Sequence, residues 1–504
     1  MHPIYSYLSG LILLVISISC STQSSELEQT LDSPPNIVLI FTDDQTYTAV
    51  QALGNEEIET PNLDRLVHNG TTFTHAYNMG GWNGAICVAS RSMMISGRTV
   101  WRANQFKDAW QQGDSLALTQ TWGKLMEQAG YNTYMTGKWH VAAPAESVFQ
   151  TVRHIRPGMP NDSRDQGSFD SPETMPLGYN RPKNEQDNSW SPYDTAMGGF
   201  WEGGKHWSEV LKDDALDYVN DAVAQPDPFF MYLAFNAPHD PRQSPKEFVD
   251  RYPLDSISLP ESFMPRYPYE EEIGLGPKLR DEALAPFPRT EYATKVHMQE
   301  YYAIVTHLDQ QIGEILDALE ASGKMENTYI FFTADHGLSV GRHGLLGKQN
   351  MYDHSVRVPL MLVGPDIPAN RQVETDVYLQ DVMASSLELA GIEKPDYVEF
   401  NSLLGLAKGE TEQGPYDAIY GGYINYQRMI RKDDMKLIVY PQANEVLLYN
   451  LKEDPKELTD LADDPDYVDE VASLFEDLLA LQQQFEDTLD LEPMYRELTS
   501  GTLP

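Results

Sequence analysis

Short apolar segments that end abruptly in charged or imidazole-bearing residues occur four times along this chain. The run 36–41 has no polar interruption after its first residue and leads directly into Asp43 and Asp44. Such a run is typical of a strand that is covered on both faces of a sheet. The other three runs are 132–135 before Lys138 and His140, 229–235 before His239, and 329–332 before Asp335 and His336.

Segments with helical periodicity lie between these runs, at 116–129, 207–223 and 298–321. Strands that alternate with helices predict an α/β fold, here with a large, mixed, mainly parallel sheet sandwiched by helices. Ligand sites in such folds lie beyond the carboxyl ends of the strands. We therefore expect the polar residues that follow the four runs to converge there.

Two long stretches, about 141–205 and 240–297, show no sustained periodicity, and we expect loops or insertions that border the binding face. Near residue 390 the pattern changes. The runs 436–440 and 446–449 predict an antiparallel hairpin, and a last helix is expected over about 467–487. These features predict a catalytic domain over 36–390 and a smaller C-terminal α+β domain over 391–504, with a short antiparallel sheet.

The net charge is −40 over 504 residues, which makes nucleic acid and anionic membrane surfaces poor partners. Residues 8–18 are mostly apolar, too short to span a bilayer, and are followed closely by Cys20. We expect residues 1–20 to be an export signal of the lipoprotein type with Cys20 lipidated; a cleaved signal and a buried segment are the alternatives. The polar run 21–35 is typical of a tether. The expected location is the periplasm, with membrane attachment only through the lipid.

Three carboxylates follow two of the predicted strands. If the sheet brings Asp43, Asp44 and Asp335 together, their charges repel and raise one another's pKa. A hard divalent cation relieves this repulsion, and oxygen-rich ligation favours calcium or magnesium. Each pair taken singly is more often a helix cap or a turn. The metal interpretation therefore depends on what else lies nearby.

The segment Cys87-Val-Ala-Ser-Arg91, followed by Ser-Gly-Arg at 96–98, resembles the signature of the type I sulfatases, Cys/Ser-x-Pro/Ala-Ser-Arg. The motifs Asp-Asp-Gln, Gly-Lys-Trp-His, Pro-His and Asp-His-Gly follow the order of that family, and the resemblance extends from Asn36 to about Asp464. It implies an alkaline phosphatase-like fold and the hydrolysis of sulfuric esters. His336, where many members have Asn, is similar to the iduronate-2-sulfatase-like branch.

The resemblance also implies a cofactor and a modified residue. One calcium ion per chain would be held by Asp43, Asp44, Asp335, His336 and the side chain at position 87. Cys87 would be oxidised after synthesis to formylglycine, an aldehyde. One hydroxyl of the hydrated aldehyde attacks sulfur, and the other then collapses to release sulfate. A helix that opens at this position would favour anion binding.

The remaining family positions are cationic. By resemblance, Arg91 hydrogen-bonds the diol, and His140 assists deprotonation of its second hydroxyl. Lys138 and Lys348 hold sulfate oxygens, and His239, with or without Lys348, protonates the leaving alcohol. A lone histidine is more often a packed polar residue, so these roles depend on the setting. They also require a local positive cluster in an acidic protein.

Ala89 stands where many members have Pro, which implies a radical-type formylglycine-generating maturase as partner. The expected substrate is a sulfated carbohydrate, such as the algal polysaccharides ulvan, fucoidan or carrageenan or their oligosaccharides, with glycosaminoglycans next. One alternative is a phosphonate monoester or phosphodiester hydrolase of the same superfamily. The other is a sulfated-glycan-binding lipoprotein without activity.

Overall fold

A nine-stranded sheet forms the centre of the computed structural model, which describes Met1 and residues 34–160, 183–189 and 191–500. Its strands run in the order β11-β2-β10-β9-β1-β8-β4-β5, and β12 also pairs with β2. All pairings except those of β10 are parallel. The strands are β1 (Asn36–Thr42), β2 (Thr71–Tyr77), β4 (Asn132–Lys138), β5 (Thr151–Arg156), β8 (Phe229–Ala234), β9 (Thr328–Ala334), β10 (Arg357–Val363), β11 (Arg371–Val373) and β12 (Val377–Tyr378).

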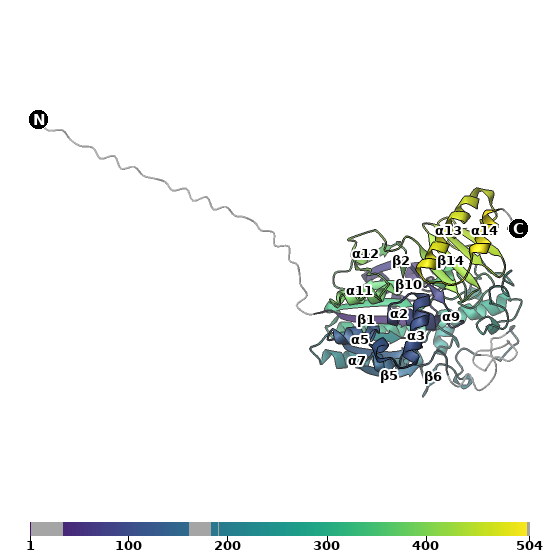
Figure 1. The fold of residues 1–504 in the computed structure, drawn as a ribbon. Coiled ribbons are helices and arrows are strands. Elements are labelled where there is room, and N and C mark those ends of the chain that lie inside the picture. The colour runs from purple at the N-terminus through teal and green to yellow at the C-terminus, as the bar shows by residue number, and fades with distance from the viewer. Residues whose placement is uncertain (2–33, 161–182, 190, 501–504) are drawn as a thin grey trace. The chain divides into compact units, whose positions relative to one another are not determined.

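Helices cover both faces of this sheet, because its central strands are apolar on both sides (Figure 1). In β1, Ile37, Leu39 and Phe41 pack in one core, and Val38 and Ile40 pack in the other. The first core contains α2 (Ile86–Ser96), α3 (Val100–Gln111), α4 (Ser115–Thr119), α5 (Trp122–Gln128), α6 (Ala145–Val148), α11 (Asp381–Leu389) and α12 (Leu404–Lys408). The second contains α1 (Pro61–Asn69), α7 (Trp207–Val223) and α9 (Glu291–Ala321).

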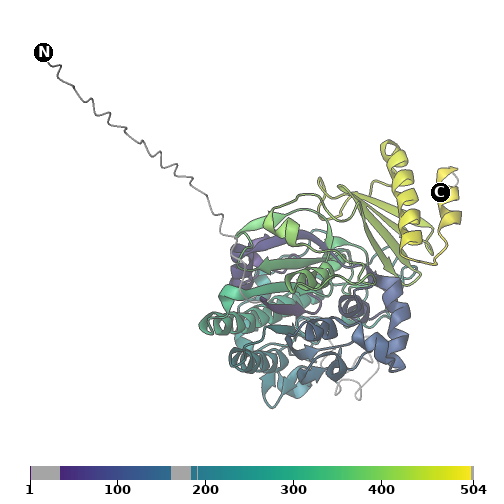
Figure 2. The ribbon, with the colours of Figure 1, turned by 60° about the vertical axis from the view of Figure 1, so that its left-hand side comes forward.

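A second, smaller sheet has the order β16-β15-β14-β13-β3 and is antiparallel except where β3 joins β13. Helix α13 lies against it (Figure 2). The strands are β3 (Gly80–Gly81), β13 (Ile419–Tyr423), β14 (Gln427–Lys432), β15 (Met435–Tyr440) and β16 (Glu445–Asn450), and the helices are α13 (Val468–Gln484) and α14 (Glu492–Thr499). Shorter elements are the hairpin β6 (Trp201–Glu202) and β7 (Lys205–His206), α8 (Lys246–Val249) and α10 (Asp353–Val356).

The predicted fold class is confirmed, and so are the four buried strands and the hairpin at 436–449. Two expectations were wrong. The helix over 116–129 is two helices, because Thr121 takes an extended conformation between α4 and α5. The stretch 141–205 contains β5, which lies partly exposed at the edge of the main sheet and carries two apolar residues, Val152 and Ile155.

Some predictions lie beyond what the structure tests. The expected signal at 1–20 with Cys20 lies outside the described residues, as does nearly all of the tether over 21–35. Residues Ser33–Pro504 form one unit, distinct from Met1–Asp32, so the domain boundary near residue 390 stays a prediction. Within the described part of the chain, none of the helices has the length and apolar character needed to cross a membrane.

Candidate active site

The carboxyl ends of four neighbouring strands carry the site. The adjacent strands β9, β1, β8 and β4 end next to one another, and each is followed by predicted site residues. Asp43 and Asp44 follow β1, Asp335 and His336 follow β9, and His239 follows β8. At β4, Lys138 is the last residue of the strand and His140 lies just beyond it. These residues are therefore gathered by strand order and not by sequence proximity.

Helix α2 delivers Cys87 to this edge of the sheet. Cys87 is the second residue of the helix, and the preceding Ala85 provides no side-chain cap. The first backbone N–H groups of such a helix lack intrahelical acceptors and favour a negative charge nearby. The Cys87 sulfur is buried and lies 3.3 Å from Nδ1 of His140. The predicted nucleophile position is thus in the first turn of a helix.

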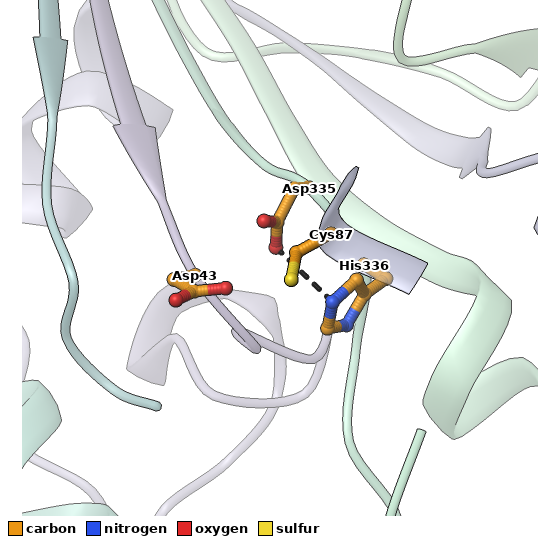
Figure 3. A group of neighbouring side chains, drawn as sticks. All are labelled: Asp43, Cys87, Asp335 and His336. Atoms are coloured by element: carbon orange, nitrogen blue, oxygen red, sulfur yellow. Dashed lines mark ion pairs between the residues drawn. The ribbon is translucent and has the colours of Figure 1, made fainter. Parts of the chain in front are cut away.

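Four residues enclose a common point at the centre of the site, as Figure 3 shows. One potential ligand atom from each of Asp43, Cys87, Asp335 and His336 lies within 4.8 Å of the others. A second, overlapping group consists of Asp43, Asp44 and His239. All these side chains are buried. This geometry is compact enough for a single cation.

Some of the potential ligand atoms in this group lack hydrogen bonds, as expected where a metal ion would bind. Oδ1 of Asp43 is buried and has no hydrogen-bond partner among the described residues, and Nε2 of His336 makes no hydrogen bond there, although it lies 3.2 Å from Oδ1 of Asp44 and 3.5 Å from Oδ1 of Asp335. Buried polar atoms without partners are rare in folded proteins and point to an unseen ion or water. Carboxylate oxygens are the preferred ligands of calcium and magnesium. The residues therefore fit a hard divalent cation, with the imidazole as its one nitrogen ligand.

Lysine side chains offset the carboxylate charge. Nζ of Lys138 contacts Oδ2 of Asp43, and Nζ of Lys348 lies 2.9 and 3.1 Å from the two oxygens of Asp44. Burial raises the pKa of Asp44 to about 7, although Lys348 and His336 act to lower it. Burial lowers the pKa of Lys348, but Asp44 outweighs this effect and the pKa is raised. The Lys348 ammonium group thus remains charged deep in the site.

The carboxylate of Asp335 is held in its charged form. Burial would raise its pKa, but His336, Arg91 and Lys138 lower it to about 2. Arg91 donates from Nε to Asp335 over 2.9 Å and from Nη1 to the carbonyl oxygen of Lys138 over 2.8 Å. The expected bond of Arg91 to the diol at position 87 stays a prediction; its contacts show that Arg91 joins α2 to two strand ends.

The surroundings of Cys87 stabilise negative charge. Burial would raise the pKa of its thiol, yet the pKa is well below the ordinary value because Lys138, His140 and Lys348 outweigh burial. A side chain that gains negative charge during a reaction is stabilised by the same positive groups. The local positive cluster that the sequence required in an acidic protein is therefore present at this position.

One glycine lets β4 approach the site. Gly137 has φ +94°, and a Cβ at this position would lie 2.0 Å from the carbonyl oxygen of Ala234 in β8. The register between β4 and β5 also shifts between Thr136 and Gly137. Any larger residue would push β4 away from β8 and move Lys138, the next residue. Gly137 thus positions the lysine that contacts Asp43.

A cavity of about 170 Å³ opens onto the nucleophile position. Of the predicted residues, Cys87, His140, His239 and Lys348 line it. The residues of its outer wall were not predicted from the sequence. They lie in segments that have no periodicity or that are far apart along the chain. This wall is formed by Gly84, Ala85, Gly158, Met159, Leu279, Arg280, Asp281 and Gln349.

Arg280 is the main charged group of that outer wall, and its charge is compensated. Its guanidinium contacts the carboxylates of Asp240 and Asp281. Asp281 also accepts a hydrogen bond of 2.7 Å from the amide of Gln349. The only signal in the sequence was Asp240, which directly follows His239. The wall therefore offers several fixed donors and acceptors rather than a bare cation.

The comparisons with known proteins agree with this arrangement. The family model described as Sulfatase matches residues 35–392, and that described as N-sulphoglucosamine sulphohydrolase, C-terminal, matches residues 341–484. The first match spans well over half of the chain. The chain therefore belongs to the sulfatase family, whereas its place in the iduronate-2-sulfatase-like branch stays a prediction.

Individual relatives match over most of their length. An arylsulfatase of Clostridium perfringens is 28% identical, with 87% of this chain and 92% of the relative covered. An ulvan-active sulfatase of Formosa agariphila is 27% identical, with 90% and 83% covered. A solved enzyme in complex with its substrate D-glucosamine-2-N,6-O-disulfate has a TM-score of 0.70 at 22% identity, covering 90% of this chain and 99% of that one. This last likeness shows a shared fold.

Proposed function

We propose that the chain is a calcium-dependent sulfuric ester hydrolase that removes sulfate from a sulfated carbohydrate through a formylglycine made from Cys87. One observation carries the proposal. Cys87 lies in the first turn of α2, within 4.8 Å of the ligand atoms of Asp43, Asp335 and His336, and it lines a cavity. A cysteine that is buried only for packing requires neither metal-ligating neighbours nor a cavity beside it.

The cation would be held by Asp43, Asp44, Asp335 and His336 together with an oxygen of the side chain at position 87. When bound, it would supply positive charge that polarises the nucleophile and the sulfate group. The calcium identity rests on the oxygen-rich donor set and on the resemblance to the family. Magnesium is the ion against which it must be tested.

The proposed reaction proceeds in two steps that return the starting side chain. One hydroxyl of the hydrated aldehyde bonds to sulfur, the bond between sulfur and the ester oxygen breaks, and the alcohol leaves with a proton. The second hydroxyl then loses its proton, the bond between carbon and the sulfate oxygen breaks, and the aldehyde and free sulfate form. Water rehydrates the aldehyde, so each turnover consumes one water molecule.

His140 is placed to take the proton of the second hydroxyl, because its Nδ1 lies 3.3 Å from the side-chain atom of residue 87. Lys138 and Lys348 would hold the sulfate oxygens, since their ammonium groups contact Asp43 and Asp44 at the centre of the site. Both ammonium groups are buried, so their attraction for a sulfate ester is not weakened by bulk water.

His239 is the proposed proton donor to the leaving alcohol. Its Nδ1 donates to the carbonyl oxygen of Asp240 over 2.6 Å, so Nε2 is the nitrogen that exchanges protons. Burial and the charge of Lys348 lower its pKa to about 3. An anionic sulfate ester offsets the charge of Lys348 and raises that pKa, so the substrate itself favours the protonated imidazole.

A carbohydrate substrate is supported by the relatives and by the outer wall of the cavity. The named relatives include an ulvan-active sulfatase and an enzyme with a bound glucosamine disulfate. In this chain, Arg280, Asp281 and Gln349 present donors and acceptors of the kind that hydroxyl groups require. An algal polysaccharide such as ulvan, fucoidan or carrageenan, or its oligosaccharides, is the proposed substrate.

Maturation and location complete the proposal. Ala89 favours a radical-type maturase as the partner that oxidises Cys87. The apolar segment at 8–18 followed by Cys20 favours export to the periplasm with a lipid anchor. Mass spectrometry of the N-terminal peptide from membrane fractions tests this; an unmodified Cys20 on a soluble form would exclude the anchor.

The central experiment combines mass spectrometry and turnover. The chain is co-expressed with a radical-type maturase, and the peptide across Cys87 is expected to carry formylglycine. The product should hydrolyse 4-nitrophenyl sulfate and release sulfate from a glycan panel, whereas Cys87→Ala should do neither. Faster hydrolysis of an aryl phosphate diester would favour the phosphodiesterase alternative. An intact thiol with glycan binding but no sulfate release would favour the binding protein.

A further inference from the structure

A second cavity, of about 390 Å³, lies beside the loop that leads into α2. Three parts of the chain that are distant in sequence form it: the loop after β3 together with α3, the turn between β13 and β14, and the segment after α13. No step of the proposed reaction uses it. Its walls consist of Trp82, Trp101, Asn104, Gln105, Ile424, Asn425, Arg428 and residues 486–489.

The walls combine flat aromatic surface with neutral hydrogen-bonding groups. Trp82 and Trp101 are partly exposed, and both pack against the core of the second sheet. The amides of Asn104, Gln105 and Asn425 each carry donors and an acceptor. An aromatic platform with a few convergent polar groups is the usual make-up of a site for a small organic ligand. A sugar ring has the matching apolar face and hydroxyl rim.

The charged groups of this cavity are already paired. Arg428 donates from Nε to Asp487 over 2.6 Å and from Nη2 over 2.8 Å. Glu486 lies 3.1 Å from Nε of Arg102. The described part of the cavity therefore offers no uncompensated cation to a sulfate or carboxylate group. The aromatic and amide groups that remain are suited to an uncharged sugar ring.

The walls of the two cavities come close together along the chain at one loop. Trp82 lines the second cavity and Gly84 lines the catalytic one. Two residues of extended chain span at most about 7 Å, so the two walls lie close together. The amide of Ile424 donates to the carbonyl oxygen of Gly81 over 3.0 Å and fixes this loop against the second sheet. A ligand that fills both cavities would bridge a very short distance.

The platform is rigid on one side. The indole nitrogen of Trp101 donates to the hydroxyl of Tyr420 over 2.9 Å, and the guanidinium of Arg428 lies 4.8 Å from the centre of the Trp101 ring. The indole nitrogen of Trp82, by contrast, is buried without a hydrogen-bond partner among the described residues. Because this nitrogen is buried, Trp82 offers a ligand only its partly exposed ring.

We propose that this cavity is a second sugar-binding subsite, which holds an uncharged ring of the same glycan whose sulfate ester enters the catalytic cavity. The inference rests on the proposed function in one respect, namely that the substrate is a glycan. It adds that recognition extends beyond the sulfated ring, across the wall formed by residues 82–85. Longer oligosaccharides would therefore be better substrates than a single sulfated sugar.

The test compares substrates of different length. Carrageenan and ulvan oligosaccharides of two, four and six sugars are assayed alongside 4-nitrophenyl sulfate, which is too small to reach both cavities. In the wild type, kcat/KM is expected to rise with oligosaccharide length. Trp82→Ala and Asn425→Ala should each lower the ratio of kcat/KM for the hexasaccharide to that for 4-nitrophenyl sulfate about tenfold, mainly through KM. Trp82→Phe should restore part of it.

Direct binding provides a second readout. Chemically desulfated hexasaccharides should quench the tryptophan fluorescence of the full chain, and Trp82→Ala should abolish this change. Leu116→Ala, which removes an exposed apolar side chain that lines neither cavity, serves as the control. The inference is overturned if kcat/KM is independent of length, or if desulfated hexasaccharides leave the fluorescence unchanged.

The two proposals fail in different ways. An enzyme with formylglycine at position 87 that does not hydrolyse 4-nitrophenyl sulfate would refute the proposed function, whatever the fluorescence shows. An enzyme that hydrolyses it, but treats disaccharides and hexasaccharides alike in wild type and Trp82→Ala, would refute only the subsite.

Discussion

Arg91 and Asp335 form a fully buried ion pair, in which Nε of the guanidinium lies 2.9 Å from Oδ2 of the carboxylate. Arg91 belongs to α2 and Asp335 follows β9, so the pair ties the helix of the nucleophile position to the centre of the main sheet. The second bond of Arg91, to the carbonyl oxygen of Lys138, adds β4 to the same connection. The side chain of Arg91 thereby fixes the positions of α2, β9 and β4 relative to one another.

Removal of this guanidinium should destabilise the protein strongly. Arg91→Met leaves Asp335 as a buried carboxylate without its partner, which costs about 3–5 kcal/mol. The free energy of unfolding from urea denaturation measures this loss. Arg496→Met is the control, because Arg496 and its partner Glu492 are exposed and 3.4 Å apart, and such pairs are worth at most about 1 kcal/mol. Similar losses in both variants would contradict the structural role of Arg91.

Much of this site was predictable, because strand order converts distant sequence segments into neighbours. Each of the four apolar runs ended in polar residues, and parallel strands place such ends along one edge. Asp43, Asp335 and Cys87 could be grouped on that ground, together with the sulfatase-like motif. The hairpin at 436–449 was also predictable, because turn residues separate two short, mainly apolar, strand-like runs.

Other features depend on contacts that leave no local pattern. Strand β5 is only half-buried at the edge of the sheet, and its two apolar residues, Val152 and Ile155, are three apart and give no strand periodicity. Arg280 acquires its place through Asp240 and Asp281, one of which is distant in the chain. The second role of Arg91 likewise depends on the approach of β9 to α2. Single-sequence periodicity carries no information about such pairings.

Calcium should stabilise the protein through the acidic cluster. A ligand that binds only the folded state adds about 2.7 kcal/mol at 100 times its dissociation constant. We expect calcium to raise Tm in the wild type and EDTA to reverse this rise, while Asp43→Asn and Asp335→Asn abolish the response. Asp317→Asn is the control, since Asp317 is an exposed carboxylate paired with Arg65. A response to magnesium alone would instead reassign the cation.

Lys348 should matter for turnover as well as for stability, because it is the buried partner of Asp44. Its ammonium group lies 2.9 Å from Asp44 and lines the catalytic cavity. Lys348→Ala removes a preorganised positive group, a change that typically costs about 10²–10³ in kcat. Hydrolysis of 4-nitrophenyl sulfate measures it, with Lys408→Ala, whose partner is Asp366, as control. A loss of less than threefold in Lys348→Ala would exclude it from sulfate binding.

Acid should destabilise the protein through His343, which stacks on Tyr352 with ring centres 4.0 Å apart. Burial, with smaller contributions from Arg342 and Lys436, lowers the pKa of His343 to about 4 against the opposing effect of the Glu457 carbonyl. As the pH falls, His343 is protonated in the unfolded chain before it is protonated in the folded protein. The contribution of neutral His343 to the free energy of unfolding is therefore complete above pH 6.5 and is lost as the pH falls to 4. Its size is about 3 kcal/mol.

Urea denaturation between pH 7 and pH 4 measures that loss. His343→Phe removes the titrating group and should make the free energy of unfolding less dependent on pH in this range. Tyr352→Phe is the control, because it keeps the stack and both His343 and the neighbouring His354, whose Nε2 lies 3.3 Å from Nδ1 of His343. An unchanged slope in His343→Phe would show that other groups cause the acid sensitivity.

The junction between the two sheets should depend on the absence of a side chain at Gly80. Gly80 has φ +84°, and a Cβ there would lie 2.1 Å from the carbonyl oxygen of Gly422, its partner in the pairing of β3 with β13. Gly80→Ala must therefore strain its backbone and separate the strands. Gly130→Ala isolates the first effect, because Gly130 has φ +89° with open space around it. Gly130→Ala should lower the free energy of unfolding by about 1–2 kcal/mol.

Gly80→Ala should cost about 1–3 kcal/mol more than that control, because overpacking is added to the backbone strain. Since β3 leads through Trp82 into α2, the variant should also lower kcat/KM for 4-nitrophenyl sulfate, whereas Gly130→Ala should not. Denaturation and turnover measured on the same preparations separate the two effects. Equal stabilities of the two variants would mean that β3 can move away from β13 freely, and the loop before Cys87 would then not depend on the second sheet for its position.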